Sequence, residues 1–273
     1  MLQSDGNILS IVIVVKDNLL GYEKTMRSIL AKAQNLTKFI ELLIIDGSSN
    51  NDINISHNDF VTAISDVSKV RLKYYRLPAN GVYNAMNLAI KKCQSDWVWF
   101  INSGDISIVD INKIAEKISI VSEQCNVLCG YVGKTFDSHK SFFVKEKNQI
   151  AHQGMIYRKK IHQKYGFYSE ELRGASDIIF IKKLVPMEVQ FEKITVAVCE
   201  VSPLNMSRQE KTLSYDFKII RYISFKRYVI QKFVFLIEGK LGFSVTSYAK
   251  SLANWVLLQE RHYYLERKIE PSN

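Results

Sequence analysis

Short apolar runs of strand length alternate with helical periodicity along the first half of the chain. Residues 8–15 form an almost continuous β-branched run, which is typical of a strand buried on both faces of a parallel sheet. We expect further strands at residues 39–45, 70–75 and 97–101, and helices at residues 22–33 and 82–92. Strands that alternate with helices at this spacing predict βαβ units. The sequence therefore predicts an α/β fold with a mainly parallel central sheet flanked by helices.

The pattern is looser in the second half of the chain. We expect helices at residues 111–121 and 176–184, short strands at 127–132, 154–157 and 194–201, and a polar loop or hairpin at 136–147. From residue 208 onward, 12 Lys and Arg stand against 6 Asp and Glu, so this segment carries +6 of the chain's net charge of +10. The shift in charge predicts a domain over residues 1–207 and a C-terminal extension over residues 208–273.

Basic and aromatic residues are interleaved at helical spacing in the extension, which we expect to be amphipathic and helical. Such a surface favours docking on anionic lipid at the inner face of the cell membrane. The alternative is a solvated pair of helices packed on the domain or on a second subunit.

Composition limits the setting in which the protein works. The four cysteines show no zinc-ligand spacing, so we expect reduced, mostly buried thiols. No apolar stretch is long enough to span a bilayer, and the polar N-terminus leads us to expect no signal peptide. These features favour a cytoplasmic protein, peripheral on the membrane if the extension binds lipid.

Polar motifs follow two of the predicted buried strands. Asp46-Gly47-Ser48-Ser49 follows the strand at 39–45, and Asn102-Ser103-Gly104-Asp105 follows the strand at 97–101. Open α/β sheets bind ligands at the carboxyl ends of their strands. A carboxylate placed there can hold a divalent cation that neutralises a diphosphate. Taken alone, each motif is equally typical of an ordinary turn at the end of a strand.

Three further motifs are individually weak. Gly81-Val82-Tyr83-Asn84-Ala85-Met86-Asn87 opens a predicted helix whose first-turn amides favour an anion. Ala151-His152-Gln153-Gly154 precedes a short strand, and Ala175-Ser176-Asp177 begins a helix.

Together, the motifs agree in order and spacing with one family. Over residues 8–206 the sequence resembles family 2 glycosyltransferases of the GT-A fold. It looks most like the branch that includes the colanic-acid glycosyltransferases of bacterial surface-polysaccharide pathways. The family commonly has Asp where this chain has Asn84, and a second acidic residue in the motif that here keeps only Asp105.

The resemblance implies a role for each matching residue. Asp177 would be the general base, and Asp105 would be the carboxylate that holds a divalent cation, Mn²⁺ or Mg²⁺. Contacts to the nucleotide sugar would come from Val15, Asp17, Asp46, Ser48, Asn84, Asn87, Ser103, Gly104, His152 and Gln153.

The implied activity is that of an inverting, metal-dependent hexosyltransferase. It would move a sugar from a nucleotide-sugar donor, a UDP-sugar in preference to a GDP-sugar. The acceptor would be a glycan or a polyprenyl-diphosphate-linked glycan in the biosynthesis of capsule, exopolysaccharide or O-antigen.

Four other classes of function agree less well with the sequence. A GT-A binding protein without catalytic activity is consistent with Asn84 and with the single acid in the metal motif. A sugar-phosphate nucleotidyltransferase would need a Gly-rich phosphate loop with basic residues after the first strand, and Val14–Leu20 offers none. A nucleic-acid binder agrees with the pI of 9.3 but shows no base-reading module, so we expect no nucleic-acid partner. A dinucleotide oxidoreductase lacks Gly-x-Gly-x-x-Gly after the first strand.

Overall fold

One mixed sheet organises the described part of the chain, which in this computed structural model comprises residues 7–64, 69–136 and 150–201. The chain divides into two compact units. The first contains residues 1–135, 143–171 and 176–200. The second contains residues 136–142, 172–175 and 201–273, most of which lie outside the described residues. The predicted extension at 208–273 and most of the predicted loop at 136–147 lie outside them as well.

The strand order of the sheet is β3-β2-β1-β4-β7-β6-β8-β5. The first four strands in this order are mutually parallel, as the alternation of strands and helices predicted. Beyond them, β7 pairs antiparallel with β4 and β6, and β5 pairs antiparallel with β8. The strands are β1 (Leu9–Val15), β2 (Ile40–Asp46), β3 (Val70–Arg76), β4 (Trp97–Asn102), β5 (Ile106–Ser107), β6 (Val127–Phe136), β7 (Met155–Arg158) and β8 (Val189–Val201).

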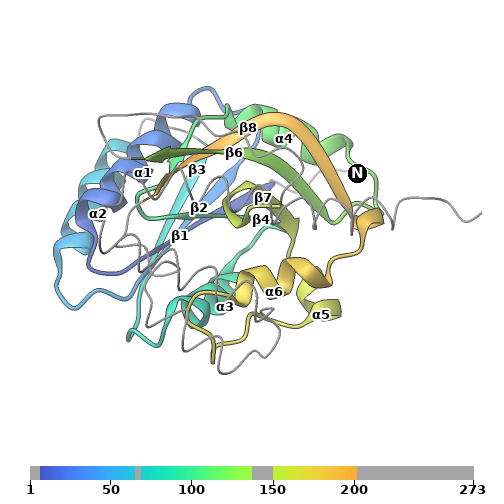
Figure 1. Cartoon of the computed structure of the whole chain (residues 1–273). Helices are drawn as coiled ribbons and strands as arrows, with labels where there is room; N and C mark the ends of the chain where they lie inside the picture. Colours follow the sequence, from blue (N-terminus) through green and yellow to red (C-terminus); the bar gives the residue numbers. More distant parts are fainter. Residues whose placement is uncertain (1–6, 65–68, 137–149, 202–273) are drawn as a thin grey trace, which may run out of the picture. The chain divides into compact units, whose positions relative to one another are not determined.

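Helices cover both faces of this sheet. Figure 1 shows α1 and α2 on one side of the parallel strands and α3 on the other, with α5 and α6 beside α3. The α-helices are α1 (Leu19–Lys32), α2 (Asp52–Ile64), α3 (Val82–Lys92), α4 (Ile111–Ile120), α5 (Ile161–Tyr165) and α6 (Ser176–Lys183). Two short 3₁₀ helices are η1 (His152–Gly154) and η2 (Pro186–Glu188). None of the helices in the described ranges is both long and apolar enough to cross a membrane.

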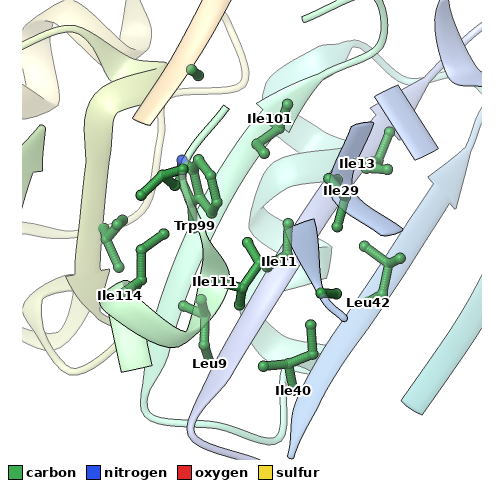
Figure 2. Close-up of a cluster of buried hydrophobic side chains, with 14 of the residues drawn as sticks. Leu9, Ile11, Ile13, Ile29, Ile40, Leu42, Trp99, Ile101, Ile111 and Ile114 are labelled. Atoms are coloured by element: carbon green, nitrogen blue, oxygen red, sulfur yellow. The ribbon is translucent and has the colours of Figure 1, made fainter. Parts of the chain in front are cut away.

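The main core lies between the sheet and α1, α2 and α4. Alternate residues of the parallel strands point into it, and Figure 2 shows Leu9, Ile11 and Ile13 of β1 in one cluster with Trp99 and Ile101 of β4. The residues between them, such as Val12 and Val98, are fully buried on the other face. Burial on both faces explains why β1 reads as a continuous apolar run. The three cysteines whose side chains are described, Cys93, Cys125 and Cys129, are buried free thiols, as expected.

The amino-terminal edge of the parallel strands contains a buried carboxylate with internal partners. Glu41 is fully buried, and its Oε1 lies 2.9 Å from Lys73 Nζ. Its Oε2 accepts hydrogen bonds from the Ser10 hydroxyl at 2.5 Å and from the Gln94 amide at 2.9 Å. Lys73 balances the charge of this buried carboxylate, and Ser10 and Gln94 hold its Oε2.

Candidate active site

The carboxyl ends of β1, β2, β3 and β4 meet at one edge of the sheet. Val15 pairs with Asp46, Asp46 pairs with Arg76, and Val14 pairs with Asn102. Val15 itself is buried, and its carbonyl accepts a 2.9 Å hydrogen bond from the Gly47 amide. This register brings the loops after β1, β2 and β4 side by side, as the motif order predicted.

Asp46, the last residue of β2, is fully buried, and both of its carboxylate oxygens are held. Oδ1 accepts a hydrogen bond from the Ser48 amide at 2.8 Å, and Oδ2 accepts one from the Tyr74 hydroxyl at 2.5 Å. Burial and the bond to Asp46 raise the pKa of Tyr74. Behind it, the His57 ring lies 4.7 Å from the Tyr74 ring, and His57 Nδ1 lies 3.1 Å from the Tyr22 hydroxyl. These two hydrogen bonds fix the carboxylate in one orientation.

The loop after β1 is tied to the loop after β2. The Asp17 amide donates to Ser48 Oγ at 2.8 Å, and Asp17 Oδ1 accepts from the amide and the hydroxyl of Ser49 at 2.8 and 2.9 Å. These bonds to Ser49 lower the pKa of Asp17. They also hold Asp17 at a φ of 49°, which is uncommon for a residue other than glycine.

Arg76, at the end of β3, adds a positive charge to this edge. Its Nη2 donates to the carbonyls of Ser48 and Asn50 at 3.3 and 2.7 Å. Arg76 was not predicted as a residue of the site, because nothing in its local sequence pattern distinguishes it from a surface arginine.

The loop that contains Ser103, Gly104 and Asp105 is anchored to α1. The Gly104 amide donates to the Gly21 carbonyl at 3.0 Å and to the Thr25 hydroxyl at 2.9 Å. The Ser103 hydroxyl donates to the Asn18 carbonyl at 3.3 Å. Gly104 has a φ of 106°, where a side chain would be strained, so the turn requires glycine here. Asp105 follows it with 7% of its surface exposed.

The donor set at this loop limits the kind of metal site that the chain can form. Within residues 7–64, 69–136 and 150–201, no three His, Cys, Asp or Glu side chains are placed to hold a metal ion together. Mg²⁺ in phosphate-transferring enzymes is commonly bound by one or two carboxylates together with the phosphates of the substrate. Asp105 is the carboxylate of this loop, and a single carboxylate is compatible with a cation that a diphosphate also binds.

A second group of predicted residues meets where α6, α3 and η1 come together. Asp177 lies in the first turn of α6, and its Oδ1 accepts a 2.8 Å hydrogen bond from the Tyr83 hydroxyl. His152 is buried, with ring centroids of Phe100 and Tyr168 at 5.6 and 6.1 Å. Burial lowers the pKa of His152, and the negative charge of Asp177 acts in the opposite direction. Burial therefore favours the neutral form of the His152 imidazole, and the charge of Asp177 opposes this effect.

Neighbouring Gln153 is fixed through its backbone. Its carbonyl accepts a 2.8 Å hydrogen bond from Trp99 Nε1, which ties η1 to β4.

Asn84 and Asn87 of α3 hold the segment before α6. The side-chain amides of Asn84 and Asn87 each donate to a different oxygen of Glu170, both at 2.8 Å. Asn87 also pairs with both backbone groups of Tyr168, at 2.9 and 3.0 Å. The contact of these two asparagines with a nucleotide sugar stays a prediction, and Glu170 is a partner that no local sequence signal indicated.

Comparison with known proteins identifies the family. A model of the family described as Glycosyl transferase family 2 matches residues 10–167. An uncharacterized glycosyltransferase of Mycobacterium tuberculosis is 27% identical over 188 residues, which cover 63% of this chain and 67% of the relative. A PGL/p-HBAD biosynthesis glycosyltransferase of Mycobacterium bovis is 26% identical over 148 residues. That match covers 50% of this chain and 55% of the relative, so it spans about half of each protein.

Solved structures share the fold at low sequence identity. Staphylococcus aureus TarS in complex with UDP aligns with a TM-score of 0.55 and 17% identity, covering 81% of this chain and 73% of that chain. A mannosyltransferase from Pyrobaculum calidifontis, in complex with GDP-Man and Mn²⁺, aligns with a TM-score of 0.56 and 10% identity. The alignment covers 95% of this chain and 83% of that chain. These likenesses confirm the predicted GT-A type α/β fold. The family match over residues 10–167, more than half of the sequence, shows that the chain belongs to glycosyl transferase family 2.

Proposed function

We propose that the chain is an inverting hexosyltransferase that moves a sugar from a nucleotide sugar to a glycan or lipid-linked glycan. The pathway would be bacterial surface-polysaccharide biosynthesis, in the branch that includes the colanic-acid enzymes. The observation that carries the proposal is the shared edge of the sheet, where Asp46, the Asp17 loop and the Ser103–Asp105 loop come together. A relative named for PGL/p-HBAD biosynthesis supports glycan or glycolipid synthesis as the setting.

The proposed donor is a UDP-sugar, with a GDP-sugar as the alternative. Solved structures with the same fold contain UDP, UDP-GlcNAc or GDP-Man. In this chain Asp46 would accept a hydrogen bond from the base or ribose, because Ser48 and Tyr74 hold its carboxylate in one orientation. Val15, Asp17 and Ser48 would line the same pocket.

Asp105 would be the protein ligand of a divalent cation, Mn²⁺ or Mg²⁺, beside Ser103 and Gly104. When bound, such a cation stabilises the negative charge that develops on a leaving diphosphate. Solved neighbours contain Mn²⁺, which supports this assignment.

The chemistry that we assign to the protein is general base catalysis by Asp177. Its carboxylate takes the proton from an acceptor hydroxyl while the hydroxyl oxygen bonds to the anomeric carbon and the bond to the diphosphate breaks. A single displacement needs no protein nucleophile, so the product has the opposite anomeric configuration. His152 and Gln153, beside Asp177, would contact the acceptor or the diphosphate.

A thermal-shift screen with UDP, GDP and their common sugars, with and without Mn²⁺, tests the donor site. We expect one nucleotide class to raise the melting temperature, and to do so more strongly with Mn²⁺. At about 100-fold excess over its dissociation constant, a ligand adds roughly 2.7 kcal/mol to the stability. The absence of any shift with every nucleotide would contradict the donor site.

Residues 208–273 lie outside the described residues, so their role is proposed from the sequence. We propose that this basic, aromatic extension docks on anionic lipid and brings the domain to a lipid-linked acceptor. Co-sedimentation with liposomes should then rise with the fraction of anionic lipid and fall with salt. Binding that does not change with lipid charge would remove the membrane role.

A further inference from the structure

Tyr83 lies directly against the residue proposed as the general base. It is the second residue of α3, and only 5% of its surface is exposed. Its hydroxyl donates a 2.8 Å hydrogen bond to Oδ1 of Asp177, which is 94 residues away in the sequence. The Tyr83 ring packs near the Tyr168 ring, with centroids 5.9 Å apart. The hydroxyl is therefore held at the carboxylate by packing as well as by the hydrogen bond.

The same phenol oxygen also faces the amino-terminal end of α6. Burial and the negative charge of Asp177, which accepts the hydrogen bond, raise the pKa of Tyr83. Asp177 lies in the first turn of α6, so Tyr83 holds its carboxylate from another helix, α3.

The position of Tyr83 is itself fixed by the next turn of α3. Asn87 pairs with both backbone groups of Tyr168, and the Glu170 carboxylate accepts from Asn84 and Asn87. These bonds anchor α3 to residues 168–170, a short way before α6 begins at Ser176. Movement of the phenol relative to Asp177 would require several of these hydrogen bonds to break.

We propose that Tyr83 is a positioning residue for the general base, and that it directs Oδ2 of Asp177 toward the acceptor hydroxyl. The proposal rests on the proposed function, in which Asp177 takes the acceptor proton. A general base must first be within hydrogen-bond reach of that proton. Because a displacement of 1 Å at a reacting group can cost about 100-fold in rate, a carboxylate free to rotate would be a poorer base.

The test compares two variants that each lose one buried phenol hydroxyl. Tyr83→Phe removes the bond to Asp177. Tyr157→Phe removes hydroxyl contacts of 3.2 Å to Tyr168 and to His162, and Tyr157 does not contact Asp177 through its hydroxyl. The readout is the release of nucleoside diphosphate from the nucleotide sugars UDP-glucose, UDP-GlcNAc and GDP-mannose, with water as the acceptor.

We expect Tyr83→Phe to lower kcat by about 10- to 100-fold with the KM for the donor within about twofold of the wild type. Tyr157→Phe should keep kcat within about twofold. Equal kcat in Tyr83→Phe and Tyr157→Phe would overturn the positioning role while leaving the proposed function intact. A wild-type protein that releases no nucleotide would instead overturn the proposed function, and the positioning role with it.

A second measurement tests the contact without any substrate. Tyr83→Phe should lower the melting temperature by about 2–4 °C. The loss should be clearly smaller when Asp177 is already replaced by Ala, because the two residues share one interaction. Additive losses would show that Tyr83 and Asp177 are not coupled, and would overturn the proposal.

Discussion

Replacement of Asp177 with Asn is expected to lower the rate of sugar transfer by about 10²–10⁴-fold, the usual contribution of general base catalysis. An amide cannot take the proton of the acceptor hydroxyl. The side-chain oxygen of Asn still accepts the hydrogen bond from Tyr83, so the fold and the start of α6 should be kept. The rate is measured as the release of nucleoside diphosphate from the cognate nucleotide sugar.

Donor binding separates this effect from a general loss of structure. Asp46 and the Asp17 loop are held by their own hydrogen bonds. The dissociation constant of the nucleotide, measured by calorimetry, should therefore change less than about twofold in Asp177→Asn. Glu171→Gln is the matched control, because Glu171 is an exposed carboxylate in the segment before α6. It should keep full activity. Full turnover in Asp177→Asn would show that another group is the base.

The stability of the protein is expected to fall between pH 8 and pH 5 because of buried His162. Its Nδ1 lies 3.0 Å from the Gly166 carbonyl, and its ring stacks on Phe180 at 4.6 Å and on Phe167 at 5.3 Å. Burial lowers the pKa of His162 from 6.5 to about 4. The folded protein therefore holds the imidazole neutral over a range in which the unfolded chain binds a proton.

The sign of the pH effect follows from these two pKa values. The neutral, buried His162 contributes to the free energy of unfolding. This contribution is fully present above pH 6.5 and is lost progressively as the pH falls toward 4. Proton linkage makes the loss about 2 kcal/mol at pH 5. Urea unfolding at pH 8 and pH 5 measures it, and His162→Gln should reduce the difference between the two pH values by about that amount. If the wild type and His162→Gln lose the same free energy of unfolding between pH 8 and pH 5, His162 is not the cause of the loss.

The parallel half of the sheet could be predicted because its strands are locally unambiguous. The run at residues 8–15 agrees with β1 (Leu9–Val15), and the helix predicted at 82–92 agrees with α3 (Val82–Lys92). In contrast, α2 (Asp52–Ile64) was not predicted. Its buried Ile53 and Phe60 alternate with exposed Ile55 and Val61, so no clear apolar stripe is visible in its sequence. The two-residue β5 depends on pairing with β8, which local patterns do not reveal.

Candidate residues for the site could be proposed from the sequence, but their pairings could not. Asp46 and Asp105 were candidates because polar residues after buried strands belong to one edge of the sheet, and Asp177 was a candidate through the resemblance to the family. The bond from Tyr83 to Asp177 and the bond from Asn87 to Glu170 join residues 94 and 83 positions apart. Such contacts depend on how α3 packs beside α6, and periodicity carries no information about that packing.

The most direct test of the central claim is turnover of nucleotide sugars by the full chain. The protein is incubated with a panel of UDP-sugars and GDP-sugars in the presence of Mn²⁺, and nucleoside diphosphate is followed over time. We predict release from one nucleotide class by the wild-type protein and its loss in Asp177→Asn. A wild-type protein that binds a nucleotide sugar but releases no nucleoside diphosphate above the uncatalysed rate would contradict the proposed transferase activity. It would indicate a binding protein with a glycosyltransferase fold.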